Sequence, residues 1–418
     1  MNKSDKKQKN RLFETMKIIG PGVIVAAVVI GPGSVTTASS MGAGHGYTGL
    51  WLIVLACIFS YFYQEAAIRI TMYKEHSVFE AIRLNLSPAI SKGLFFLVFV
   101  VMLIAQASNF IGAGMAMNYF VPQLSITAWA GILIVLAVTI VLLNKENILD
   151  SFTKILVFLM VSAFVITAVV SQPNAAELVR EGFSFKIPGG KWMLALGLFS
   201  TTMVPDTPLA ASVLNKERYF LADTQEAKLP RDKKLYRAKL DLAFGLVITG
   251  LITASVLICS AAVLHPQGLS VNSAADMAMQ LTPLLGRYAG ILFSLGLWAA
   301  AFSSGAYRIR LMGDYFNFAW GHEKEQPIKF DRIIYIVTGL VPLILAVVFG
   351  GAPIALVVFS QAILGILLPI ITLILWVLVN KKEYLGEATN NIFQNIMFAI
   401  LFVITLFLAV RTFINIMF

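Results

Sequence analysis

The stretch KIIGPGVIVAAVVIGPGSVTTASS at residues 17–40 is apolar enough to cross a membrane, yet Gly-Pro-Gly-Ser stands in its middle. A second stretch, KWMLALGLFSTTMVPDTPLAASVLNK at residues 191–216, is interrupted by Pro205 and Pro208. Proline has no amide hydrogen and crowds the preceding turn, and glycine disfavours the helix. Both stretches are therefore predicted to be helices with an unwound break, and Pro32 marks the first break.

The composition is typical of a chain that lies mostly in a bilayer. The 418 residues are 58% hydrophobic and 13% charged, against about 45–50% and about 25% in a soluble domain. Soluble enzymes, nucleic-acid-binding modules and disordered scaffolds are disfavoured on this ground. The cysteines, Cys57 and Cys259, both lie inside apolar runs, which predicts buried free thiols and no disulfide framework.

Apolar runs between charged or Pro/Gly positions predict an all-α polytopic membrane protein with eleven transmembrane helices. The predicted segments lie near 17–40, 48–71, 93–120, 127–144, 152–171, 192–214, 240–264, 285–308, 332–350, 353–380 and 392–415. With the N-terminus inside, all but five of the 32 Lys and Arg fall on or near the inner side. This bias explains the net charge of +10 without a nucleic-acid partner.

The same pattern divides the chain into four parts. Residues 1–16 are a basic cytoplasmic N-terminus, and residues 17–214 hold the first six helices. Residues 215–239 form a basic cytoplasmic loop, and residues 240–418 hold helices seven to eleven. We expect one transport domain in the plasma membrane, surrounded by lipid, with the N-terminus in the cytoplasm and the C-terminus outside.

The two predicted breaks stand in matching positions, in the first and the sixth segment. Interrupted helices five spans apart are typical of carriers built from an inverted repeat of five plus five helices. In hydrocarbon, backbone groups freed from a helix need partners in protein or in a water-filled cavity. The pattern therefore predicts a substrate site between the breaks, near the middle of the membrane.

Several motifs along the chain resemble the Nramp family of divalent metal-ion transporters. They are IIGPGVIVAAVVIGPGSVTTASSMGAGHGYTGLW at 18–51, AQASNFIGAGMAMNYF at 105–120, TTMVPDTPLAAS at 201–212 and FSQAILGILLP at 359–369. The resemblance identifies a divergent Nramp-related member of the amino acid-polyamine-cation superfamily. It implies a LeuT-type fold with broken helices 1 and 6 and transport by alternating access, and neither an enzyme nor a cofactor.

At the breaks the sequence departs from the family's motifs. The metal-binding Asp and the Asn of the first helix become Gly31 and Ser34. On the sixth helix the family's Met becomes Val204 and the adjacent His becomes Asp206. The family's Ala whose carbonyl helps to bind metal corresponds to Thr201.

Further departures concern proton movement. On the third segment, Gln106 and Asn109 replace the Asp and Glu of the family's proton path. Amides hydrogen-bond but do not titrate near neutral pH. Phe302 replaces a polar Gln on the eighth segment, whereas Gln361 remains on the tenth. Weak or absent proton coupling is therefore expected.

The predicted site is a set of oxygen donors around the two breaks. Its substrate-binding residues are Gly31, Gly33, Ser34, Thr201, Thr202, Val204, Asp206 and Gln361, of which Gly31, Ser34, Thr201 and Asp206 are the candidate metal ligands. Without a thioether, such a site favours a hard cation such as Mg²⁺ or Ca²⁺, or relaxes the selectivity.

Other functions stay open at this stage. A helix N-terminus at the GPGS segment suits the carboxylate of an amino acid or another small acid, with Asp206 meeting an amine. A passive conductor and a receptor that no longer transports are two further alternatives. A structural ion pair is also predicted, because Glu65 and Arg69 are one helical turn apart.

Overall fold

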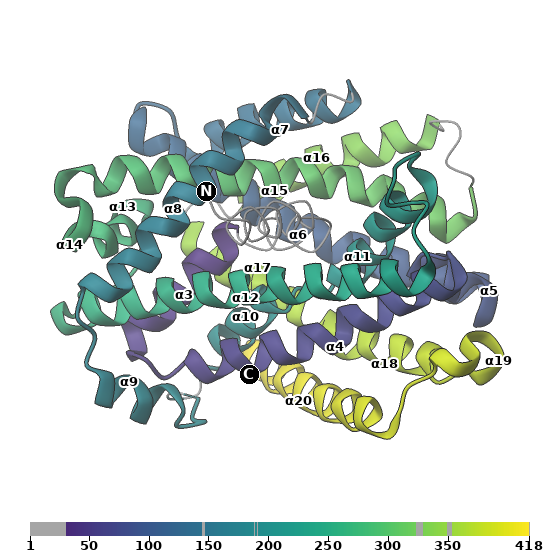
Figure 1. Ribbon diagram of the computed structural model, residues 1–418. Helices are drawn as coiled ribbons and strands as arrows, with labels where there is room; N and C mark the ends of the chain where they lie inside the picture. The colour runs from purple at the N-terminus through teal and green to yellow at the C-terminus, as the bar shows by residue number, and fades with distance from the viewer. Residues whose placement is uncertain are drawn as a thin grey trace, which may run out of the picture.

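The computed structural model describes residues 31–143, 147–187, 189, 191–322, 329–348 and 353–417. In this part of the chain all the regular elements are helices (Figure 1). Seven of them are long and apolar enough to cross a membrane, or eight if the bent pair at 157–182 counts as one span.

The helices follow the order of the predicted segments. Those before the second break are α3 (Pro32–His45), α4 (Leu50–Lys74), α5 (Val78–Asn85), α6 (Pro88–Phe120), α7 (Ile126–Leu142), α8 (Asn147–Val170), α9 (Ala175–Gly182) and α10 (Trp192–Thr202). Those after it are α11 (Thr207–Lys216), the π-helix η2 (Glu217–Leu221), α12 (Arg231–Val263), α13 (Ala274–Ala278), α14 (Thr282–Leu285), α15 (Ala289–Trp320), α16 (Lys329–Val348), α17 (Pro353–Gly365), α18 (Leu367–Val379), α19 (Lys382–Leu385) and α20 (Ile392–Met417).

Three boundaries differ from the predicted segments. Helix α15 continues to Trp320 instead of ending near residue 308, and α12 begins at Arg231, inside the predicted loop. The apolar run of α15 ends at its arginines, but the helix does not, because Arg308 is buried and Arg310 pairs with Glu217 at 3.2 Å. The tenth segment is two helices, α17 and α18.

The two predicted breaks lie at helix ends. Helix α3 begins at Pro32, after an extended Gly31 with φ −125° and ψ −172°, while residues 17–30 of the first segment lie outside the described residues. In the sixth segment α10 ends at Thr202 and α11 begins at Thr207. Pro208 lies in the first turn of α11, where the missing amide hydrogen costs little.

The helices pack in two groups around these ends (Figure 1). One group contains α3, α4, α10, α11 and α12, and the other contains α6, α7, α15 and α16; α17 lies between α10 and α6, and α8 packs on both α12 and α15. Close packing of α6 on α3 depends on Gly112, since a Cβ there would lie 2.3 Å from Cβ of Pro32. Both helix groups therefore meet where α3 begins.

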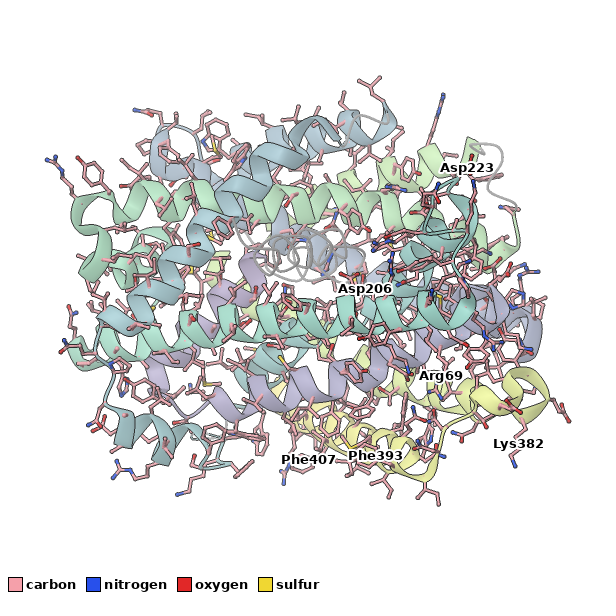
Figure 2. The ribbon with its side chains drawn as sticks, viewed as in Figure 1. Arg69, Asp206, Asp223, Lys382, Phe393 and Phe407 are labelled. Atoms are coloured by element: carbon pink, nitrogen blue, oxygen red, sulfur yellow. The ribbon has the colours of Figure 1, made fainter. Side chains whose placement is uncertain are left out.

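Charged residues gather at one end of the molecule, where Asp223 and Lys382 lie in Figure 2, while Asp206 lies towards the middle. The predicted pair is confirmed there, with Arg69 Nη2 3.3 Å from Glu65 Oε2. Lys239 from α12 also reaches Glu65, at 2.7 Å. The pair between Lys239 and Glu65 ties α12 to α4 at that end.

Candidate functional site

The break between α10 and α11 leaves the backbone carbonyl of Thr201 without a helical partner. The amide that would bond to the carbonyl of Thr201 belongs to Pro205, which has no hydrogen. No residue in the described part of the chain donates a hydrogen bond to this oxygen. Thr201 is 2% exposed, so its carbonyl is a buried acceptor at the C-terminal, partially negative end of α10.

Three carbonyls just before α11 have partners. Thr207 donates its amide at 3.1 Å and its hydroxyl at 2.7 Å to the carbonyl of Val204. Tyr63 donates to the carbonyl of Pro205 at 2.8 Å. The carbonyl of Asp206 accepts the hydroxyl of Tyr315 at 3.3 Å. The carbonyls of Val204, Pro205 and Asp206 are thus paired, whereas no described residue beyond α10 donates a hydrogen bond to the carbonyls of residues 200–203.

At the start of α3, a serine closes the first turn on itself. The amide of Gly31 donates to Oγ of Ser34 at 3.1 Å, and this hydroxyl donates to the carbonyl of Gly31 at 3.0 Å. A Cβ on Gly31 would lie 3.6 Å from Oδ1 of Asn109 and 3.7 Å from Oγ of Ser304. Position 31 therefore faces α6 and α15, and no carboxylate projects from it.

Helix α17 brings Gln361 to the same place. A Cβ on Gly33 would lie 2.4 Å from Cδ and Nε2 of Gln361, so a larger residue would displace this amide from its position. The backbone carbonyl of Gln361 accepts the hydroxyl of Ser200 at 2.5 Å. Helices α3, α10 and α17 thus meet at Gly33, Ser200 and Gln361, of which Gly33 and Gln361 are predicted site residues and Ser200 precedes the predicted Thr201.

The side-chain amides of Gln106 and Asn109 on α6 are linked by hydrogen bonds. Gln106 donates through Nε2 to the carbonyl of Gly305 at 2.9 Å, and Asn109 donates through Nδ2 to Oε1 of Gln106 at 3.0 Å. Both side chains are buried. Phe302 stacks on Trp298 with ring centroids 6.0 Å apart, which keeps that part of α15 apolar. Neither these two amides nor Phe302 titrates near neutral pH, and the nearby charge is that of Arg308, whose Nη1 lies 3.6 Å from Sδ of Met102 on α6.

Asp206 is 4% exposed and precedes α11 without capping its helix through the side chain. Within the described residues no hydrogen bond or ion pair joins its carboxylate to Gly31, Ser34 or Gln361. The charge that acts on it is that of Arg308 on α15, which is 6% exposed. The expected position of Asp206 beside the oxygen donors of α3 and α17 therefore stays a prediction from the sequence. In the structure, the charge that influences Asp206 is on α15.

The two remaining predicted residues are buried side chains of the break. Thr202 donates its hydroxyl to the carbonyl of Leu198 at 3.0 Å, and Val204 packs on Leu214. No group of three or more His, Cys, Asp and Glu side chains is close enough to hold a metal in the part of the chain described. Any cation bound there would depend on backbone, hydroxyl and amide oxygens with at most one carboxylate.

Sequence reasoning missed Tyr63, Tyr315 and Arg308. An arginine inside an otherwise apolar run was the available signal, since ionisable groups in membrane spans are rare and functional. The tyrosines gave no such signal, because aromatic residues are common in apolar helices.

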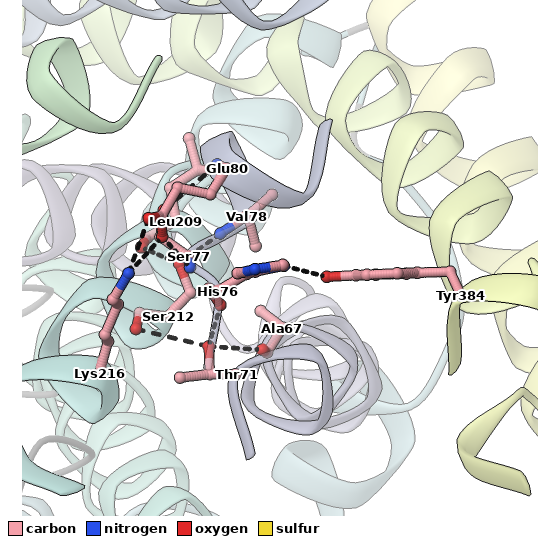
Figure 3. A network of polar contacts seen from close by, with 10 residues as sticks. All are labelled: Ala67, Thr71, His76, Ser77, Val78, Glu80, Leu209, Ser212, Lys216 and Tyr384. Atoms are coloured by element: carbon pink, nitrogen blue, oxygen red, sulfur yellow. Dashed lines mark hydrogen bonds and ion pairs between the residues drawn. The ribbon is translucent and has the colours of Figure 1, made fainter. Parts of the chain in front are cut away.

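The other end of α11 is anchored by a dense polar network (Figure 3). Lys216 Nζ lies 2.7 Å from both carboxylate oxygens of Glu80, and Oγ of Ser212 accepts the amide of Val78 at 3.0 Å. Nδ1 of His76 is hydrogen-bonded to the hydroxyl of Tyr384, 3.0 Å away. Desolvation lowers the pKa of His76, which lies between α4 and α5.

Comparison with known proteins shows the family to which the chain belongs. The sequence matches the family described as Natural resistance-associated macrophage protein-like, Nramp, over residues 22–415. The chain belongs to this family. The divalent metal cation transporter MntH of Bacillus subtilis is 27% identical over 383 residues, which cover 90% of this chain and 86% of that protein. The metal transporter Nramp3 of Oryza sativa is 25% identical, over 92% of this chain and 71% of its own length.

Solved structures give the same fold for this Nramp chain. A manganese transporter of Eremococcus coleocola superposes with a TM-score of 0.73 at 19% identity, covering 94% of this chain and 85% of its own. MhsT in complex with L-phenylalanine superposes with a TM-score of 0.62 at 17% identity, covering 94% and 97%. The resemblance drawn from the motifs is confirmed, and the chain is a multi-pass membrane protein with the LeuT-type fold.

Proposed function

We propose that this Nramp protein is a secondary carrier that moves a divalent metal cation across the plasma membrane by alternating access. The proposal takes residues 17–214 and 240–418 as one transport domain, with the N-terminus in the cytoplasm and the C-terminus outside. The names of the relatives support a divalent cation as cargo. The family's fold, with helices that end at matching prolines, supports a carrier.

One observation carries the choice of a cation. Pro205 frees the carbonyl of Thr201 at the negative end of α10, in a buried place where an unpaired acceptor is costly. A cation satisfies such an oxygen. In this proposal the amide oxygen of Gln361, which lies against Gly33, and the hydroxyl of Ser34 complete the set of donors.

Selectivity follows from the kinds of donor. Val204 stands where the family has a thioether, so a soft ligand for Mn²⁺ or Fe²⁺ is missing. Carbonyl, amide and hydroxyl oxygens, with Asp206 as the one carboxylate, suit a hard and partly hydrated ion such as Mg²⁺. We therefore propose a preference for hard cations, or relaxed selectivity.

Coupling to protons is proposed to be weak or absent along α6. Gln106 donates to the carbonyl of Gly305 and Asn109 donates to Oε1 of Gln106, so hydrogen bonds hold both amides in place. Neutral amides fixed in this way do not release or take up protons near neutral pH.

A second candidate is a carrier of a small carboxylate or amino acid. It is favoured by the absence of a carboxylate at Gly31, which would repel an anion at the N-terminus of α3. In that case Arg308 and Asp206, both buried, would supply charges of both signs near the break.

Ligand-dependent thermal stability of the purified protein tests these alternatives. A ligand at 100 times its Kd adds about 2.7 kcal/mol to the free energy of unfolding. We expect Mg²⁺ or Ca²⁺ to raise Tm more than Mn²⁺, and amino acids to leave it unchanged. Stabilisation by an organic acid with no response to any metal would overturn the cation proposal.

Uptake into proteoliposomes separates the carrier from the other classes. A carrier gives saturable uptake with counter-flow. Current that rises with voltage without saturating would indicate a passive conductor, and binding without uptake would indicate a receptor.

A further inference from the structure

Two buried tyrosines hold the break between α10 and α11 from different helices. Tyr63 of α4 donates its hydroxyl to the carbonyl of Pro205 at 2.8 Å. Tyr315 of α15 donates to the carbonyl of Asp206 at 3.3 Å. Both tyrosines are fully buried, so these bonds form away from water.

The two carbonyls differ in their other partners. The carbonyl of Asp206 also accepts the amide of Ala210 at 2.9 Å, within the first turn of α11. For the carbonyl of Pro205, Tyr63 is the one donor that the described residues provide. Loss of the Tyr63 hydroxyl therefore leaves a buried acceptor unpaired, whereas loss of the Tyr315 hydroxyl does not.

The two helices also belong to different packing groups. Helix α11 packs along α4, in the group that contains α3, α10 and α12. Helix α15 packs mainly on α6, α8 and α16, and touches α11 only lightly. In carriers with broken helices, alternating access arises largely when one rigid group moves against the other.

We propose that Tyr63 and Tyr315 are positioning residues with separate tasks. Tyr63 fixes the shape of the break within its own helix group, and so holds the carbonyl of Thr201 in place for the cation. Tyr315 makes the contact between the groups that breaks and re-forms in each transport cycle. This assignment rests on the proposed function as a cation carrier. It adds that Tyr63 sets the affinity for the cation and that Tyr315 sets the turnover rate.

The test compares Tyr63→Phe, Tyr315→Phe and Tyr219→Phe in the full-length protein. Tyr219 is the matched control, because it is 1% exposed and its hydroxyl has no hydrogen-bond partner in the described part of the chain. Mg²⁺ affinity is measured by titration of Tm, and KM and Vmax are measured from Mg²⁺ uptake into proteoliposomes. Vmax is divided by the number of Mg²⁺-binding molecules, so that misfolded protein does not lower it.

For Tyr63→Phe we expect Kd and KM to rise about tenfold with Vmax unchanged, as for loss of one buried hydrogen bond. For Tyr315→Phe we expect Kd within about twofold of the original and Vmax changed by about threefold or more, because the contact between the groups alters the barrier between conformations. Tyr219→Phe is expected to leave all three constants unchanged.

Two results would overturn the assignment. One is a shift of the same constant, in the same proportion, by Tyr63→Phe and Tyr315→Phe. The other is an equal effect of Tyr219→Phe, which would mean that any buried hydroxyl matters. If the unmodified protein binds no cation while an organic acid stabilises it, the proposed function fails first, and this result is visible before any variant is made.

Discussion

The two ends of α11 lie in opposite chemical surroundings. At its N-terminal end, beside the break, are backbone carbonyls, amides and hydroxyls, with one carboxylate that forms no ion pair within the described residues. At its C-terminal end, Lys216 pairs with Glu80 and Ser212 accepts the amide of Val78 (Figure 3).

This difference indicates that the two ends of α11 have different roles, ligand binding at the break and anchoring at Lys216. Where every donor has a matched acceptor, as at Lys216, the contact is strong in one geometry and serves as an anchor. Where the carbonyl of Thr201 is left over, a ligand can complete the arrangement and leave again. Changes at the break should therefore alter affinity, and changes at the anchor should alter stability.

The largest effect on the break is expected from Gly33→Ala. A Cβ there would lie 2.4 Å from Cδ of Gln361, so the amide must move away. We expect Mg²⁺ affinity to fall at least about thirtyfold, since contacts to a charged ligand are each worth about 1.5–3 kcal/mol. Titration of Tm measures it. Gly44→Ala, in the same helix with open space around it, is the control, and equal losses in both variants would contradict the site.

At the anchor, Glu80→Gln should lower stability without changing affinity. The side chains of Glu80 and Lys216 are 16% and 14% exposed, so the pair is largely shielded from solvent. We expect the free energy of unfolding to fall by about 2 kcal/mol, with Kd for Mg²⁺ unchanged. A double-mutant cycle with Lys216→Met checks that the loss belongs to the pair. If Glu80→Gln changed Kd as much as Gly33→Ala does, the claim that the anchor affects stability and not affinity would be contradicted.

A smaller effect is expected when a titrating group is returned to α6. Gln106→Glu places a carboxylate beside the carbonyl of Gly305 and Asn109. We expect Mg²⁺ uptake to be insensitive to pH in the original protein and to vary about threefold per pH unit near the pKa of the new carboxylate in the variant. Internal acidification of liposomes and the pH profile of KM measure this. Proton entry of equal size before and after the change would contradict an inert α6.

The smallest effect concerns His76 at the anchor. Desolvation lowers its pKa in the folded protein, so the folded state favours the neutral imidazole. This contribution to stability is complete above pH 6.5 and is lost as the pH falls through the lowered pKa. Tm should therefore decline slightly more between pH 6.5 and 5 in the original protein than in His76→Gln. A parallel decline in both would assign the pH effect to other groups.

Several residues of the candidate site could be predicted from the sequence. Gly33, Ser34, Thr201 and Gln361 were singled out by motif, and the structure brings Gly33 of α3 and Ser200 of α10 against Gln361 of α17. Asp206 was singled out too, but the group whose charge reaches it, Arg308, lies on α15. No local pattern links residues on helices so far apart in sequence.

The sequence by itself determined that the sixth segment is interrupted near Pro205 and that the chain lies in a membrane. A missing amide hydrogen at Pro205 or Pro208 is a covalent property, and long apolar runs need no partner to be recognised. Only the tertiary structure decided which freed carbonyls are used and which remain. The bonds from Tyr63 and Tyr315 span 142 and 109 positions of the chain, and such contacts depend on how whole helices pack, which hydropathy and spacing do not encode.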